Sequence, residues 1–82
     1  MNQIERIESM ERLFDFVIEA RKEQHTNQEK SARIQEALRI LAEYYTSDEW
    51  KQDFADDEAG RLPKDLKRGV LSEDGLWNLL YS

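Results

Sequence analysis

Apolar side chains recur at intervals of three and four residues through the first half of the chain, which is the spacing of one face of a helix. In the first segment the apolar positions are Ile4, Ile7, Met10, Leu13, Phe14, Val17 and Ile18. In the second segment they are Ile34, Ala37, Leu38, Leu41, Tyr44 and Tyr45. The pattern predicts two long helices, over residues 3–24 and 27–45, and the short link between them predicts an antiparallel hairpin.

Residues that commonly cap helices stand at the start of both segments. Asn2 is followed three residues later by Glu5, which is the spacing of a capping box. Thr26 or Asn27 can cap the second helix. The only histidine, His25, falls in the link and has no neighbouring nucleophile or paired carboxylate, so we interpret it as a solvated loop residue.

A third helix is predicted by the strongest local signal in the chain. Thr46 can act as its N-cap, and Glu49 three residues later can return the capping bond. Tyr45 before this cap and Trp50 after it then form a hydrophobic staple. We expect the helix to cover residues 47–59 and to end at Gly60, because glycine readily adopts the left-handed backbone conformation that follows a helix.

All three glycines and the only proline fall after residue 59. Residues 60–72 are therefore expected to form a structured loop, in which a single-turn helix over residues 63–67 is one alternative. Ser72 followed by Glu73 and Asp74 predicts a last short helix over residues 73–81. Together these patterns predict an all-α fold, in which the antiparallel hairpin of two long helices is covered by the shorter third helix, the loop and the C-terminal helix.

Size and composition limit what this fold can be. The 82 residues suffice for one domain, residues 1–82, and the 39% hydrophobic content against 37% charged residues predicts a small core in a monomer or a homodimer. Cysteine is absent, so disulfides and thiolate metal sites are excluded. We find no pattern of a signal peptide or of a membrane span, and we expect a cytoplasmic protein.

The net charge of −6 bears on the partners. An acidic surface argues against direct binding to the phosphates of nucleic acid. It is compatible with an acidic protein that mimics nucleic acid and inhibits a nucleic-acid-binding protein, although acidity most often serves solubility.

Charges of opposite sign form neighbouring blocks in the second half. The acidic block contains Asp53, Asp56, Asp57 and Glu58. The basic block contains Arg61, Lys64, Lys67 and Arg68. The simplest interpretation is that the two blocks pair with each other. Two sharper hypotheses are a cation site on the acids, which lack the spacing of known metal motifs, and an anion site at Lys67, Arg68 and Gly69.

The aromatic residues allow two interpretations. They are Tyr44, Tyr45, Trp50, Phe54 and Trp77. They could line a ligand groove, but in so small a chain we expect them to form the core.

A family resemblance rests on the second half of the chain. Residues 57–75 read DEAGRLPKDLKRGVLSEDG, and they follow the run from Tyr44 to Trp50 and the pair Asp53 and Phe54. This stretch resembles domain of unknown function 4298, a family of short bacterial and phage-associated proteins, and the N-terminal segment resembles it more loosely. The resemblance implies an all-helical cytoplasmic protein, supplies no activity or catalytic residue, and leads us to expect more helix after Ser82 in other members.

The leading functional hypothesis is a non-enzymatic protein-interaction module without a cofactor or a metal. We expect its unknown protein partner to bind at Arg61, Lys64, Lys67, Arg68, Gly69, Glu73, Asp74 and Trp77. The alternatives are the acidic nucleic-acid mimic, which requires a one-sided array of carboxylates, and a small metal-dependent enzyme that uses the acids of residues 53–58.

Overall fold

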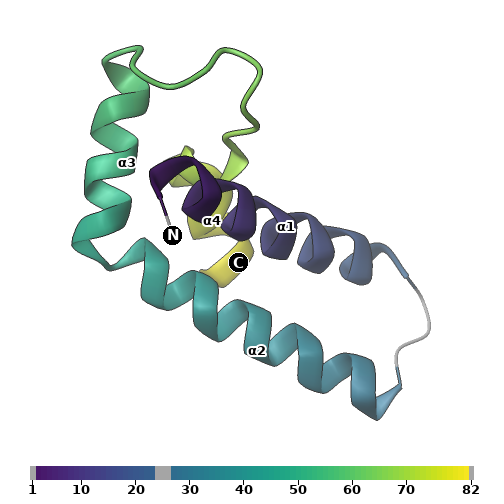
Figure 1. The fold of residues 1–82 in the computed structure, drawn as a ribbon. Coiled ribbons are helices and arrows are strands. Elements are labelled where there is room, and N and C mark those ends of the chain that lie inside the picture. The colour runs from purple at the N-terminus through teal and green to yellow at the C-terminus, as the bar shows by residue number, and fades with distance from the viewer. Residues whose placement is uncertain (1, 24–26, 82) are drawn as a thin grey trace.

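The chain folds as a helical hairpin that is covered by three shorter helical segments (Figure 1). The computed structural model describes residues 2–23 and 27–81. Its elements are α1 (Gln3–Lys22), α2 (Gln28–Tyr45), α3 (Asp48–Glu58), the 3-10 helix η1 (Gly69–Leu71) and α4 (Glu73–Tyr81). α2 packs along α1 in the opposite direction, and it also contacts α3 and α4. The predicted all-α class and the hairpin are confirmed.

The caps of the two long helices follow the sequence signals. Asn2 and Glu5 form the expected capping box, in which the Asn2 side chain accepts from the Glu5 amide at 2.9 Å. Asn27 caps α2 by accepting from the Lys30 amide at 2.7 Å. The predictions for Thr26 as a cap and for His25 in the link fall outside the described residues. The prediction that the first helix reaches residue 24 was wrong, because α1 ends at Lys22 and Glu23 already has an extended backbone.

The N-cap of α3 is Ser47, and the prediction of Thr46 was wrong by one residue. The Thr46 hydroxyl donates to the Ala42 carbonyl at 3.1 Å and thereby closes the C-terminus of α2. Ser47 has the extended backbone of an N-cap, and its side chain accepts from the Trp50 amide at 3.2 Å. The predicted contact between Tyr45 and Trp50 nevertheless forms, with ring centroids 4.9 Å apart.

Gly60 ends α3 as expected. Its φ is +72°, and the amides of Gly60 and Arg61 donate to the carbonyls of Asp57 and Asp56 at 3.0 and 2.9 Å. This pair of bonds is a Schellman motif, which requires the left-handed conformation that glycine adopts without strain. The structure places the single-turn helix at η1 and not at residues 63–67, where a turn closed by the Leu66 amide and the Pro63 carbonyl takes its place.

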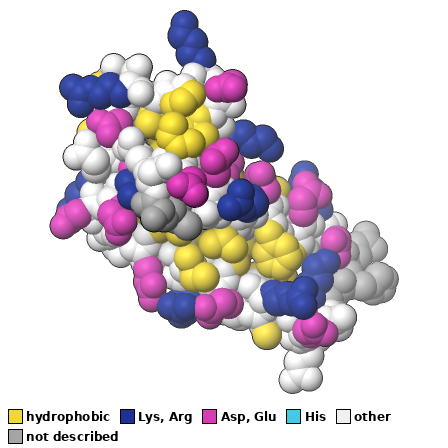
Figure 2. Space-filling model, viewed as in Figure 1, with side chains coloured by type: hydrophobic (Ala, Val, Ile, Leu, Met, Phe, Trp, Pro, Cys, Tyr) yellow, Lys and Arg dark blue, Asp and Glu magenta, His cyan; other side chains and the backbone are white. Residues whose placement is uncertain are grey.

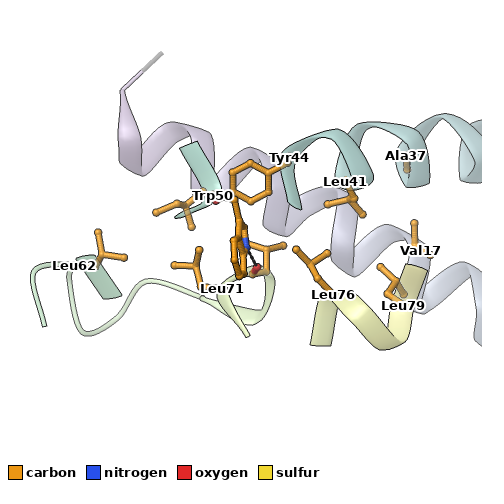
Figure 3. Packing of buried hydrophobic residues seen from close by; sticks show 11 residues of the cluster. Val17, Ala37, Leu41, Tyr44, Trp50, Leu62, Leu71, Leu76 and Leu79 are labelled. Carbon is orange, nitrogen blue, oxygen red and sulfur yellow. Dashed lines mark hydrogen bonds between the residues drawn. The ribbon is translucent and has the colours of Figure 1, made fainter. Parts of the chain in front are cut away.

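The core lies between α2 on one side and η1 with α4 on the other, as Figure 3 shows. It is formed by Ile7, Val17, Ala37, Leu41, Tyr44, Trp50, Leu62, Val70, Leu71, Leu76 and Leu79. Four of the five aromatic residues named from the sequence are buried in this core or packed against it. The fifth, Trp77, is 51% exposed, so for Trp77 the prediction of a core position was wrong.

Candidate functional site

The predicted site residues separate into a group that holds the fold and a group that faces solvent. Arg68 belongs to the first group, because its guanidinium donates to the Asp57 carboxylate and to the Pro63 carbonyl, each at 2.6 Å. Arg61 lies 3.3 Å from the Asp56 carboxylate. These two pairs confirm the expected pairing of the acidic and basic blocks, and they occupy two of the four basic side chains of the loop.

Gly69 has a structural task at the start of η1, where the loop crosses α1. A Cβ at this position would lie 3.0 Å from Glu11 Oε1 and 3.0 Å from the Phe14 ring. Such contacts are tighter than a packed interior accepts without a shift, so glycine permits the close approach of η1 to α1. An anion site at Lys67, Arg68 and Gly69 would have to displace the bonds of Arg68, and it would lie on a glycine that packs inward.

The remaining predicted residues are exposed. The Lys67 ammonium lies 3.4 Å from the Asp15 carboxylate on α1, which is a partner outside the acidic block. The side chains of Lys64, Glu73 and Asp74 form no ion pair or hydrogen bond with the described part of the chain. These residues and Trp77 are therefore available for contacts outside the fold.

One face of α4 gathers most of the exposed group, and we call it the α4 outer face. It consists of Glu73, Asp74, Trp77 and Tyr81, whose spacing places them on the side of the helix opposite the buried Leu76 and Leu79. Trp77 and Tyr81 are 51% and 58% exposed, and their ring centroids lie 5.8 Å apart. The sequence analysis missed Tyr81, although its distance of four residues from Trp77 on a helix was a usable signal.

A second feature is a groove between α1 and the loop, which we call the α1–loop groove. Its volume is about 370 Å³. It is lined by Ile4, Glu8, Glu11, Arg12, Asp15, Pro63, Asp65, Leu66 and Lys67. Of these residues the sequence analysis named Lys67 alone as a site residue, because no local pattern predicts which residues of α1 the loop will face.

Asp53 is fully buried, and it is a structural group. Its carboxylate accepts from the Arg6 guanidinium at 2.5 and 3.0 Å, from the Tyr44 hydroxyl at 2.6 Å and from the Gln3 amide at 3.0 Å. Burial alone raises the pKa of Asp53, but the hydrogen bonds from Arg6, Tyr44 and Gln3 outweigh it and hold the pKa below its usual value. Asp53 is therefore charged and fully bonded at neutral pH.

Glu11 is the other buried carboxylate, and its pKa moves in the opposite direction. Burial raises the pKa of Glu11, and the hydrogen bond that Oε1 accepts from the Val70 amide at 2.7 Å offsets this only in part. The carboxylate holds η1 on α1 and also lines the α1–loop groove. The same side chain therefore holds the loop in place and forms part of the groove lining.

The raised pKa of Glu11 predicts a pH effect on stability. Because the folded-state pKa lies above the unfolded one, the contribution of Glu11 to stability is complete below the unfolded pKa and is lost as the pH rises through the folded pKa. Glu11→Gln keeps an acceptor for the Val70 amide and removes this loss. As the pH rises from the unfolded-state pKa of Glu11 to its folded-state pKa, we expect the free energy of unfolding of Glu11→Gln to increase relative to that of the parent chain.

Urea denaturation at a series of pH values measures this difference. The exposed Glu19→Gln on the same helix is the control, and its difference from the parent chain should stay nearly constant with pH. If the difference in the free energy of unfolding between Glu11→Gln and the parent chain also stays constant with pH, the pKa of Glu11 is not raised by burial.

In the described residues, three of the acids named on α3 are paired with bases. No group of three or more His, Asp or Glu residues within residues 2–23 and 27–81 is placed to hold a metal ion. Asp53, Asp56 and Asp57 are each bonded to a basic side chain. Figure 2 shows acidic and basic side chains interleaved on the face that it displays. In the described residues no helix combines the length and the apolar character that crossing a membrane requires.

Comparison with known proteins places the chain in a family. The family model described as "Domain of unknown function (DUF4298)" matches residues 7–82, which is nearly the whole chain. No curated protein matches, and no solved structure matches. The chain therefore belongs to the DUF4298 family, as the resemblance of its second half indicated.

Proposed function

We propose that this member of the DUF4298 family is a non-enzymatic protein-interaction module, and that its α4 outer face binds a basic segment of a partner protein. The observation that carries the proposal is the exposure of Trp77 and Tyr81, which are the two large hydrophobic side chains that lie exposed within the described parts of the chain. Both rings lie outside the core cluster, so the fold does not require them.

Aromatic side chains on a surface are well suited to bind a protein. Tryptophan and tyrosine offer a large contact area with few rotatable bonds, and they are enriched among the residues that dominate binding energy at interfaces. Trp77 and Tyr81 are adjacent, which gives one contiguous aromatic surface on α4. A pair of this kind is the expected centre of a small interface.

The charges beside the aromatic pair indicate the chemistry of the partner. Glu73 and Asp74 flank it, and neither has an ion-pair partner in the described residues. Both acids also stabilise the first turn of α4, but Trp77 and Tyr81 have no such local task. Carboxylates attract lysine and arginine, and aromatic faces bind the same cations through cation–π interactions.

A second copy of this chain fits the face less well. In a symmetric contact between two α4 outer faces, the other copy would offer only acids and aromatic rings, so Glu73 and Asp74 would find no base there. A basic segment of a different protein supplies such a base. We propose a cytoplasmic setting for this encounter, which accords with the absence of cysteine.

The proposal is tested with a synthetic helical peptide that presents arginine at every fourth position. The uniformly labelled full chain is titrated with this peptide, and amide chemical shifts are followed by NMR. We expect the largest changes in residues 73–81, and we expect Trp77→Ser with Tyr81→Ser to weaken binding at least about tenfold, as loss of aromatic anchors does at interfaces.

The control removes the same number of charges elsewhere. Glu29→Gln with Glu43→Gln changes two exposed acids of α2, whereas Glu73→Gln with Asp74→Asn changes those of the α4 outer face. The α4 pair should weaken binding clearly more than the α2 pair. Equal losses for the two pairs, or shifts spread over all acidic surfaces, would reduce the binding to general charge attraction and overturn the proposal.

The two alternative functions have weaker support. A nucleic-acid mimic needs carboxylates that are free and arranged on one side, whereas three acids of α3 are bonded to Arg6, Arg61 and Arg68. An enzyme that uses Asp53 with its neighbours would have to act through a carboxylate that is fully buried and bonded to three side chains.

A further inference from the structure

The floor of the α1–loop groove is a carboxylate that still has capacity to accept a hydrogen bond. Glu11 is 6% exposed, and its Oε1 accepts from the Val70 amide. The backbone of Gly69 is a second hydrogen-bonding neighbour of this carboxylate, and both bonds favour its charged form. Glu11 also lines the groove, so a bound group can reach the carboxylate from the groove side.

The walls of the groove carry two further acids. Glu8 lies on α1 and Asp65 on the loop, so they border the groove from its two sides. Both side chains are exposed, and neither forms a hydrogen bond or ion pair with the described residues. Lys67 is paired with Asp15. The lining as a whole holds more acids than bases, with Arg12 and Lys67 as its bases.

Apolar side chains complete the lining. Ile4, Pro63 and Leu66 contribute aliphatic surface between the acids. The volume of about 370 Å³ falls in the range of small-molecule sites and exceeds what a single ion needs. A lining that combines acids with aliphatic side chains suits a cation that carries its own aliphatic body.

We infer that the α1–loop groove is a binding site for an organic cation, namely an ammonium or guanidinium group on an aliphatic chain, with Glu8, Asp65 and Glu11 as its acceptors. The aliphatic chain would lie against Ile4 and Leu66 and remove apolar surface from water. The same chemistry has two sources, a free alkylamine and a lysine or arginine side chain of a peptide. The site is separate from the α4 outer face and does not depend on the function proposed for that face.

The test titrates the full chain with four probes at constant ionic strength while amide shifts are followed by NMR. The probes are spermidine, agmatine, N-acetyl-lysine methylamide and N-acetyl-arginine methylamide. Binding in the groove should shift the amides of Leu66, Lys67 and Val70 first. Hexanol, which has the aliphatic chain without the charge, and ammonium ion, which has the charge without the chain, should each bind at least tenfold more weakly than the best probe.

Two double variants of equal charge decide whether the groove acids are responsible. Glu8→Gln with Asp65→Asn should weaken the best probe at least tenfold. Glu19→Gln with Glu58→Gln changes two exposed acids outside the groove and should weaken it less than twofold. All four positions are exposed, so both variants should fold, and thermal unfolding verifies this.

The possible results separate the sources and can overturn the site. Preference for spermidine or agmatine identifies a free amine as the ligand, and preference for the blocked amino acids identifies a peptide side chain. Equal weakening by the two double variants, or no shift in the groove at millimolar probe, overturns the inference. Because Trp77 and Tyr81 are unchanged in these variants, such a failure would leave the proposal for the α4 outer face standing.

Discussion

Asp53→Ala is expected to lower the free energy of unfolding by about 3 kcal/mol, which is the scale for breaking a buried and hydrogen-bonded charge pair. The variant removes the acceptor of the Tyr44 hydroxyl, which is buried and would lose a bond of 2.6 Å. It also removes the main partner of Arg6, which keeps only a more distant contact with Glu49 at 3.6 Å. Because these groups come from α1, α2 and α3, the loss should loosen the packing of all three helices.

Thermal and urea unfolding measure this effect. For a domain of this size, a loss of about 3 kcal/mol corresponds to a fall in Tm of roughly 12–24 °C. Glu58→Ala on the same helix is the matched control, because its carboxylate is exposed, and its Tm should change by no more than a few degrees. Tyr44→Phe removes one of the bonds and should cost about 1 kcal/mol. Equal Tm values for Asp53→Ala and Glu58→Ala would contradict the structural role of Asp53.

The pH dependence of this contribution is opposite to that of Glu11. The pKa of Asp53 is held below its usual value, so its contribution to stability is present above the unfolded pKa and is lost as the pH falls through the folded pKa. Glu11 loses its contribution as the pH rises. Both carboxylates are buried, and the difference arises because Asp53 accepts from a guanidinium whereas Glu11 accepts from a backbone amide.

Trp50→Ala is expected to lower the free energy of unfolding by about 3–5 kcal/mol, as loss of a buried aromatic side chain does. The indole is stacked on Phe54, with ring centroids 5.1 Å apart. Its N–H donates to the Val70 carbonyl at 2.8 Å, which is the dashed line at Trp50 in Figure 3. Val70 is therefore bonded by Glu11 from α1 and by Trp50 from α3. The variant removes both the aromatic packing and one of these two bonds to η1.

Two further variants separate packing from hydrogen bonding. Trp50→Phe keeps an aromatic ring and loses the bond to the Val70 carbonyl, so it should cost less than Trp50→Ala. Trp77→Ala removes the same side chain from an exposed position, and we expect its stability to change by less than about 0.5 kcal/mol. Hydrogen exchange at the Val70 amide should accelerate in Trp50→Ala and remain unchanged in Trp77→Ala. The same loss of stability in both tryptophan variants would be incompatible with the core described above.

The helices could be predicted because their signals are local. The capping box of Asn2 and Glu5 and the termination at Gly60 each depend on residues within one or two turns. The cap of α3 was misplaced because Thr46 and Ser47 are both suitable residues. The choice depends on the carbonyls at the end of α2, which bind the Thr46 hydroxyl.

The candidate sites were predicted only in part. Glu73, Asp74 and Trp77 were named from the sequence, and they lie together on the α4 outer face. The groove was not foreseen, because it combines residues of α1 with loop residues about fifty positions later in the chain. Arg68 was named as a binding residue because of its charge, but its guanidinium is paired with the Asp57 carboxylate within the fold.

The sequence by itself determined the all-α class, the hairpin, the end of α3 at Gly60 and the pairing between the acidic and basic blocks. The helices and the end of α3 depend on spacings of a few residues, which helix and turn geometry translate directly into contacts. Which bases pair was decided by the fold of the loop, because Arg68 meets Asp57 across 11 positions and Lys67 meets Asp15 on α1. The tertiary structure alone decided which charges are buried. Arg6 meets Asp53 across 47 positions, and Glu11 meets Val70 across 59. Such contacts depend on how the helices pack, and packing is a property of the whole chain because each buried side chain needs partners from several elements.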